Sequence, residues 1–221
     1  MICPKCEKQV GAVWEPTGLC LPCQFPPNPP KCHNCGAPSE KHLCGDCYDR
    51  KMADSWRTIC PPLFLYTEVT RLPQAPLEVV LGWQMPCTTG LLLTGPPGAG
   101  KTRCALELLR RLHWEGWPMI ITSGFEFATD CGRGMMDGQW YDQLEQVKQT
   151  PILFIDDLDK CKMTETVETQ LFGLLDWRSS RLRPIITTLN SSKSDLESRF
   201  SQVRAGAIVR RLEEFSTVVK F

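Results

Sequence analysis

Long hydrophobic runs, an excess of either charge and an apolar N-terminal segment are all missing from this sequence of 221 residues. No run approaches the ~20 apolar residues of a membrane-spanning helix, so we expect no membrane partner. Basic residues number 25 and acidic residues 25, so the net charge of zero creates no overall field that would attract nucleic acid. The first residues, MICPKC, lack the apolar core of a signal peptide, so we expect a cytoplasmic protein.

Cysteine, in contrast, is abundant: the chain has 13, and eight of them precede residue 48. That stretch has few aliphatic residues and many prolines, so it cannot build a hydrophobic core and needs metal to hold it together. A CxxC turn brings two sulfurs to one side, and two such turns complete a tetrahedral zinc site. We therefore predict two Zn²⁺ ions; sequential pairing of the turns is simplest, and an interleaved pairing stays open. The eight ligands form four CxxC pairs: Cys3 and Cys6, Cys20 and Cys23, Cys32 and Cys35, Cys44 and Cys47.

The distribution of cysteine also predicts the domain organisation. Residues 1–50 form a tandem zinc-binding module that resembles a zinc ribbon, residues 51–60 a linker with a short helix, and residues 61–221 a larger domain. In the larger domain, strand-like apolar runs alternate with helical stretches. This alternation predicts an α/β fold with a mostly parallel sheet and helices on both faces. The predicted strands cover residues 90–94, 118–123, 151–156, 184–188 and 216–221.

The most informative stretch reads GPPGAGKT and matches the phosphate-binding P-loop. Its glycines let the backbone turn so that N–H groups point at phosphate oxygens. Lys101 is expected to reach the β- and γ-phosphates and Thr102 to ligate Mg²⁺. A strand precedes the loop, and a helix whose N-terminus faces the phosphates follows it. The predicted nucleotide-binding residues are Gly95, Pro96, Pro97, Gly98, Ala99, Gly100, Lys101, Thr102 and Arg103.

Two further strand ends supply the polar groups of an ATPase. In ILFIDDLD, an apolar strand ends in two acids, the Walker B arrangement. Asp156 is expected to hold Mg²⁺, and Asp157 to act as the general base that orients the attacking water. Asn190 ends the run IITTLN and is the candidate to contact the γ-phosphate or the water, with Thr187 and Thr188 as reserves.

The segments GLLLTGPPGAGKTR, LFIDDLD, LLDWRSSRLRPIITTLNSS and GAIVRRLEEFSTVVKF occur in this order, and together they resemble the AAA+ ATPases of the DnaC/IstB type. The resemblance covers about residues 60–221. It implies a P-loop NTPase fold, ATP hydrolysis, and nucleotide sites at the subunit interfaces of an ATP-dependent homo-oligomer. It also implies that Arg211, in VRRL, is an arginine finger that reaches the neighbouring subunit's site, with Arg210 beside it and Arg199 in reserve.

The sequence departs from that family in three respects. Asp157 stands where Glu is commoner, and its shorter side chain predicts slow hydrolysis stimulated by a partner. The sequence stops at Phe221 without the helical lid, so we expect a neighbouring subunit to complete the site. The tandem zinc module is not a general feature of the family.

The resemblance implies contact with single-stranded DNA through residues 123–138, where Phe125, Phe127 and Arg133 offer two stacking faces and a phosphate contact. The alternative is an ordinary loop with both phenylalanines in the core. A basic cluster formed by Arg178, Arg181 and Arg183 is interpreted as solvated surface.

These patterns favour an ATP-dependent loader that acts on DNA and a replicative helicase in DNA replication. One alternative is a transposition ATPase that delivers a transposase to DNA. Another is a nucleotide-gated adaptor, which binds ATP with little turnover and presents the zinc module to a partner.

Overall fold

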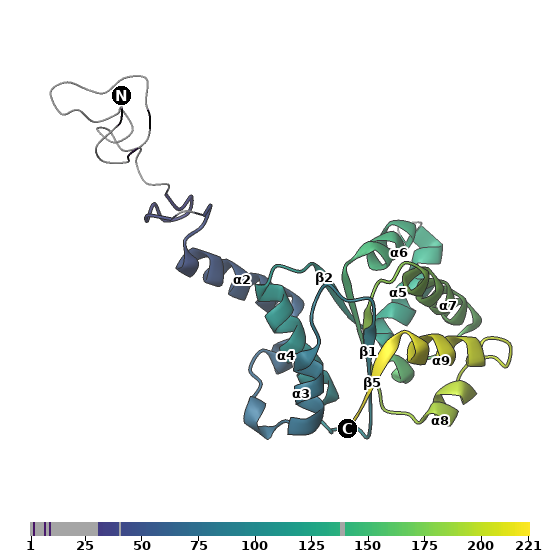
Figure 1. The fold of residues 1–221 in the computed structure, drawn as a ribbon. Coiled ribbons are helices and arrows are strands. Elements are labelled where there is room, and N and C mark those ends of the chain that lie inside the picture. The colour runs from purple at the N-terminus through teal and green to yellow at the C-terminus, as the bar shows by residue number, and fades with distance from the viewer. Residues whose placement is uncertain (1, 3–6, 8, 10–30, 40, 138–139) are drawn as a thin grey trace. The chain divides into compact units, whose positions relative to one another are not determined.

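The computed structural model describes residues 2, 7, 9, 31–39, 41–137 and 140–221 of the chain. The chain divides into two compact units, Met1–Lys51 and Met52–Phe221, and each is considered by itself. The elements labelled in Figure 1 and those between them are, in chain order, α2 (Gly45–Ile59), η1 (Pro62–Phe64), η2 (Val69–Arg71), α3 (Gln74–Gly82), β1 (Gly90–Thr94), α4 (Lys101–Trp114), β2 (Met119–Ser123), α5 (Gly124–Asp137), α6 (Trp140–Gln149), β3 (Ile152–Asp156), η3 (Leu158–Lys160), α7 (Glu165–Ser180), β4 (Ile185–Leu189), α8 (Lys193–Ser198), α9 (Ala205–Glu214) and β5 (Ser216–Lys220).

The second unit is built on a five-stranded sheet with the order β2-β3-β4-β1-β5. Its four strand pairings are all parallel, with Leu91 opposite Ile186 on one side and Thr217 on the other. All five predicted strands are present, and their ends differ from the predicted ones by at most one residue. The predicted α/β fold with a parallel sheet is therefore confirmed.

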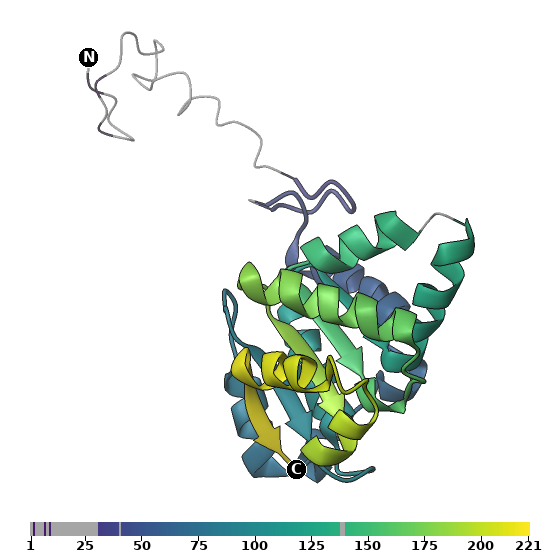
Figure 2. The same cartoon turned by 90° about the vertical axis from the view of Figure 1, so that its right-hand side faces the viewer.

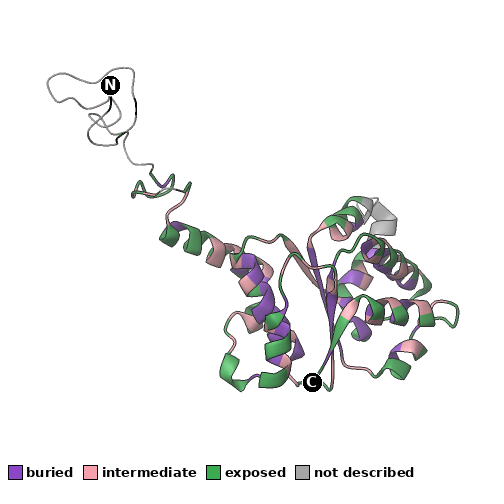
Figure 3. Ribbon diagram, viewed as in Figure 1, coloured by how far each residue is buried: buried purple, intermediate pink, exposed green. Residues whose placement is uncertain are grey.

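Helices cover both faces of this sheet, because the side chains of each buried strand alternate between two cores. Leu91 and Leu93 pack with α3 and α4, whereas Leu92 packs with helices α5 and α7–α9 on the opposite face. Figures 1 and 2 show α3 and α4 on one side of the sheet and the later helices on the other. In Figure 3 the buried residues follow the strands and the helix faces turned toward them.

The segment after β2 was interpreted as a connection, but residues 124–137 form helix α5. A reciprocal cap starts this helix: the Ser123 Oγ accepts from the Glu126 N–H at 3.1 Å, and a Glu126 carboxylate oxygen accepts from the Ser123 N–H at 2.9 Å. Phe127 and Cys131, one turn apart, are buried in the core beneath it. The three glycines of the segment weaken its helical pattern in the sequence, and packing overrides that preference.

Arg178 of α7 was grouped with surface arginines, but its side chain is completely buried. Burial lowers the pKa of Arg178 to about 9, so the group still carries its charge at neutral pH. Its guanidinium caps the C-terminal end of α6 and joins that end to the starts of β3 and β4. The acceptors, at 2.6–3.4 Å, are the carbonyl oxygens of Val147, Lys148, Thr150, Pro151 and Pro184.

We expect Arg178→Met to lower the free energy of unfolding by about 3 kcal/mol, because buried carbonyls lose their donors. Urea unfolding followed by circular dichroism would measure the change. Arg181 is the matched control, because it is exposed directly after the end of α7 and its guanidinium lies over the Trp177 ring at 4.4 Å. Equal losses for Arg181→Met and Arg178→Met would contradict the anchoring role.

Candidate functional site

The loop between β1 and α4 forms a cradle for an anion. Gly98 and Gly100 have φ angles of +80° and +97°, in the left-handed region that other residues adopt only with strain. A side chain on Gly95 would also lie 2.7 Å from the Phe221 carbonyl oxygen. The glycines of the pattern are thus required by the backbone of the loop, and in loops of this pattern the N–H groups before the helix bind an anion.

Lys101 places a positive charge in this cradle. The side chain is almost completely buried, and its Nζ donates to the carbonyl oxygens of Gly95 and Pro96, both at 2.8 Å, and to Asn190 Oδ1 at 2.9 Å. Burial lowers the pKa of the Lys101 ammonium, while nearby acids oppose that effect. All three acceptors are uncharged, so no carboxylate bonds the ammonium directly and it is available to a phosphate group.

Thr102 and Asp156 form a cluster of hard oxygen ligands beside the lysine. The Asp156 Oδ1 accepts from the Thr102 hydroxyl at 2.8 Å and from the Thr188 hydroxyl at 2.6 Å. Burial raises the pKa of Asp156, and the two hydroxyl donors oppose that shift. Oxygen atoms of this kind are the ligands that Mg²⁺ takes in phosphate-binding sites, so this pair fits the ion.

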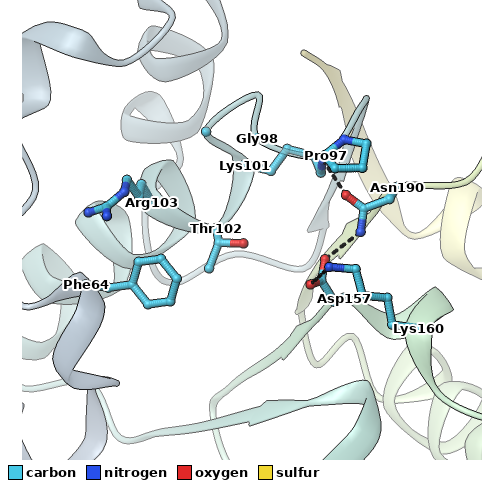
Figure 4. A pocket seen from close by; sticks show the side chains of 10 residues that line it. Phe64, Pro97, Gly98, Lys101, Thr102, Arg103, Asp157, Lys160 and Asn190 are labelled. Carbon is cyan, nitrogen blue, oxygen red and sulfur yellow. Dashed lines mark hydrogen bonds and ion pairs between the residues drawn. The ribbon is translucent and has the colours of Figure 1, made fainter.

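Asn190 connects the lysine to the second acid of Walker B. Its Nδ2 donates to Asp157 Oδ1 at 2.6 Å, while its Oδ1 accepts from Lys101. The other carboxylate oxygen of Asp157 accepts from Lys160 Nζ at 2.5 Å. Figure 4 shows this chain of four side chains crossing the cleft. Asp157 has a φ of +49°, a left-handed conformation that costs a non-glycine residue roughly 1 kcal/mol or more.

The reserve candidates Thr187 and Thr188 do not face the cleft. Both side chains are completely buried. The Thr187 hydroxyl donates to the Ile155 carbonyl oxygen at 2.7 Å, and the Thr188 hydroxyl accepts from the Asp157 N–H at 2.7 Å. These threonines therefore join strands β3 and β4 and leave Asn190 as the polar group at the end of β4.

The residues that line the resulting cleft of about 250 Å³ come from the loop, α4 and the ends of β3 and β4. Phe64 and Lys160 line it too, although the sequence analysis did not select them. Lys160 lies three positions after Asp157, one helical turn away, and that spacing was the signal that could have identified it. The residues around the cleft are Phe64, Pro97, Gly98, Gly100, Lys101, Thr102, Arg103, Asp157, Lys160 and Asn190.

A second hollow of about 370 Å³ shares Gly98, Gly100 and Arg103 with the cleft and includes Ala99. Arg103 lines both spaces, and its guanidinium lies over the Phe64 ring at 5.1 Å and donates to the Thr67 hydroxyl at 3.4 Å. Arg103 thus fastens the segment before α3 to the P-loop helix. Tyr66, Glu68, Arg71, Leu72 and Pro73 of that segment form the rest of the wall, with Gly98 and Gly100.

Arg211 is not brought to this cleft. It lies on α9 and pairs with Asp176 of α7 at 2.5 Å, with its guanidinium over the Phe172 ring at 4.7 Å. The Arg211 side chain is 20% exposed, whereas that of Arg210 is 64% exposed. Within one chain, the predicted finger is therefore held by its own α7.

In the first unit, four cysteines converge as sequential pairing predicts. The sulfur atoms of Cys32, Cys35, Cys44 and Cys47 all lie within 4.8 Å of one another. A tetrahedral zinc site with Zn–S bonds of ~2.3 Å needs sulfur separations of ~3.8 Å, and Cys35 and Cys44 are 3.6 Å apart. Backbone N–H groups of Cys44 and Cys35 lower the pKa of Cys32 to about 6, whereas the side chains of Cys47 and Cys35 raise the pKa of Cys44 to about 12, so the positions of the sulfur atoms are what fit the ion. The other predicted quartet, Cys3, Cys6, Cys20 and Cys23, lies outside the described residues.

The proposed DNA-contacting side chains separate in the structure. Phe125 is 70% exposed at the start of α5, but Phe127 is 3% exposed and belongs to the core. The prediction that Phe127 offers a stacking face is therefore wrong, because helix α5 turns it inward. The side chain of Arg133 lies outside the described part of the chain.

Across the described residues, none of the helices combines the length and hydrophobicity required to cross a bilayer.

Comparison with known proteins identifies relatives of the second unit. A model of the family described as "ATPase family associated with various cellular activities (AAA)" matches residues 91–210, more than half of the chain. The replicative helicase loader DnaI of Bacillus subtilis (strain 168) is 29% identical over 118 residues, which are 53% of this chain and 38% of that protein. A candidate ATP-binding protein in an insertion sequence of Mycobacterium tuberculosis (strain ATCC 25618 / H37Rv) is 25% identical over 152 residues, 67% of this chain and 60% of that protein.

Among solved structures, the crystal structure of DnaI superimposes with a TM-score of 0.59 over 75% of this chain and 95% of that chain. At 18% identity, this likeness shows a shared fold. The matched regions span 38% and 60% of the two curated relatives, so this chain corresponds to only part of each of them.

Proposed function

Because this chain belongs to the AAA family of ATPases, we propose that it is a helicase-loader-like ATPase that acts on DNA and on a replicative helicase. The matches to DnaI and to the insertion-sequence protein confirm the resemblance to the DnaC/IstB type. Membership of this family implies that the substrate is ATP bound together with Mg²⁺. The observation that carries the proposal is the single cleft in which Lys101, Asn190 and Asp157 are linked beside Thr102 and Asp156.

Each group in the cleft has a distinct role in the proposed reaction. The loop N–H groups and Lys101 bind the phosphates, and the second hollow beside Ala99 has room for the base and sugar. Thr102 and Asp156 would hold Mg²⁺, which neutralises phosphate charge when bound. Asp157 takes the proton of the attacking water, and Asn190 orients that water or the γ-phosphate.

Both carboxylate oxygens of Asp157, the proposed base, accept hydrogen bonds, one from Asn190 and one from Lys160. An incoming phosphate competes for Lys160, and this competition would release the Asp157 oxygen that Lys160 holds. The arrangement supports slow hydrolysis without a partner, in keeping with the short aspartate side chain.

We expect Asp157→Asn to reduce ATP turnover about 100-fold and to leave ATP affinity within about twofold, because only the base is removed. Phosphate release and titration with a fluorescent ATP analogue would measure the two quantities. Asp157→Glu is the matched variant: it keeps the carboxylate, extends it by one methylene and is expected to sustain turnover. Unchanged turnover in Asp157→Asn would exclude this residue as the base.

The partner is tested by turnover with and without single-stranded DNA and by affinity capture with helicase and transposase as candidates. DNA-stimulated turnover with helicase capture supports the loader. Capture of a transposase supports the second candidate, a transposition ATPase, which the similarity to the insertion-sequence protein favours. Turnover that stays negligible with DNA and either partner would favour a nucleotide-gated zinc adaptor.

For the N-terminal module, we propose two Cys₄ zinc sites, one at the converging cysteines and one formed by Cys3, Cys6, Cys20 and Cys23. Elemental analysis of the full chain is expected to give two zinc equivalents. Cys35→Ser should remove one, because it deletes a thiolate from the quartet. Cys87→Ser, in the second unit, is the control and should keep both. Clearly fewer than two equivalents in the unchanged protein would reject the proposal.

A further inference from the structure

Asp159 is a buried acid that the proposed reaction does not use. It lies in η3, directly after Walker B, and its side chain is 2% exposed. One oxygen, Oδ2, accepts three hydrogen bonds: from the Asn190 N–H at 2.9 Å, the Ser191 N–H at 2.6 Å and the Ser191 hydroxyl at 2.5 Å. The other oxygen is buried and accepts no hydrogen bond from the described residues.

These contacts act on the turn that carries Asn190. Strand β4 ends at Leu189, so the ladder of the sheet no longer fixes the backbone at Asn190. The Asp159 carboxylate takes over that function by binding two successive N–H groups of the turn. With the backbone held there, the Asn190 side chain reaches Lys101 at 2.9 Å and Asp157 at 2.6 Å.

Burial of this carboxylate is costly, so stability alone does not account for it. An isolated buried carboxylate is strongly disfavoured unless donors compensate it, and here one oxygen lacks a donor among the described residues. An apolar residue of similar volume would avoid that cost but would leave the N–H groups of Asn190 and Ser191 without their acceptor, so the carboxylate serves the turn and not the packing. What the Asp159 carboxylate contributes is a fixed position of the Asn190 side chain between Lys101 and Asp157.

We propose that Asp159 is a positioning residue for ATP hydrolysis, whose carboxylate fixes the Asn190–Ser191 turn so that the Asn190 carboxamide lies between Lys101 and Asp157. This inference rests on the proposed function, because it assumes that Asn190 contributes to turnover. Asp159 itself does not line the cleft and acts through the turn.

The test measures turnover and ATP affinity for Asp159→Ala, Asp159→Asn, Asn190→Ala and the double variant Asp159→Ala/Asn190→Ala. Misplacement of Asn190 is expected to lower kcat about tenfold to 100-fold in Asp159→Ala, with KM within about twofold. Asp159→Asn keeps an acceptor oxygen and the side-chain shape, so it should retain more activity and the fold. Thermal unfolding of each variant checks that the chain is folded at the assay temperature.

The double variant distinguishes a positioning role from a general loss of structure. If Asp159 acts only through Asn190, the double variant is as slow as Asn190→Ala alone, because the two changes remove one contribution. Independent effects that multiply, or wild-type turnover in Asp159→Ala, would overturn the inference and leave the proposed ATPase function standing. Wild-type turnover in Asn190→Ala would instead remove Asn190 from the reaction, and the role of Asp159 with it.

Discussion

Replacement of Lys101 by alanine is expected to abolish measurable ATP binding. The Lys101 ammonium is buried and has only uncharged acceptors, so in the proposed complex it becomes the main charge partner of the phosphates. Removing one member of a buried charged contact typically costs about 3 kcal/mol or more, which is a loss of at least roughly 100-fold in affinity. Calorimetric titration with ATP and Mg²⁺ would measure it.

Two controls separate this loss from unfolding. Lys148→Ala removes another partly buried lysine, which pairs with Glu145 at 3.7 Å on α6, and should leave ATP affinity unchanged. ATP should raise the melting temperature of the Lys148 variant but not that of Lys101→Ala, because only a bound ligand stabilises the folded state. An affinity within twofold of the unchanged protein in Lys101→Ala would contradict the phosphate-binding role.

The sheet and the P-loop could be predicted because their signals are local. GLLLT and ILFID are short apolar runs, and each is buried on both faces of a parallel sheet, which requires such a run. The loop needs glycine where its φ angles are positive, so its pattern is set by the backbone. The start of α7 is also a local signal, because Thr164 precedes an apolar helical pattern and caps the helix by accepting from the Val167 N–H.

Contacts between distant segments explain the interpretations of Arg178 and Phe127 that failed and the role of Asp159 that the sequence analysis did not identify. The sequence indicates a surface position for Arg178. Its side chain is buried because the end of α6 and the starts of β3 and β4 meet around it and supply carbonyl acceptors. Phe127 is turned inward by a helix that its glycine-rich segment does not favour. Asp159 is the third acid of DDLD, and its contact with the turn at Asn190 spans 31 positions in the sequence.

The single-chain structure also sharpens the prediction of a shared active site. We propose that Arg211 acts on the neighbouring subunit, and to do so it must leave Asp176, with which it pairs at 2.5 Å. The Asp176 carboxylate is 54% exposed, so solvent screens this ion pair, and a contribution of about 1 kcal/mol does not prevent such a release. Arg211→Ala should therefore lower turnover roughly 10³-fold while ATP affinity stays nearly unchanged, because a finger acts mainly in the transition state.

Asp176→Ala is the matched control for this prediction, because it removes the same ion pair and keeps the arginine. If Arg211 only stabilises α9 on α7, both variants lose little stability and retain similar turnover. If Arg211 is the finger, Asp176→Ala retains turnover and Arg211→Ala loses it. Arg210→Ala, which removes the more exposed neighbour, tests whether that residue acts instead.

Mixing experiments then test whether the site is shared between subunits. An Arg211→Ala subunit keeps an intact P-loop, and a Lys101→Ala subunit keeps an intact Arg211, so a mixture contains interfaces in which both groups are present. We expect such a mixture to recover part of the activity that each variant lacks alone, and turnover of the unchanged protein to rise more steeply than linearly with protein concentration. Full activity in a strictly monomeric sample, or no loss when Arg210 and Arg211 are both replaced, would exclude a shared site. The adaptor, in which nucleotide only gates presentation of the zinc module, would then be the better account.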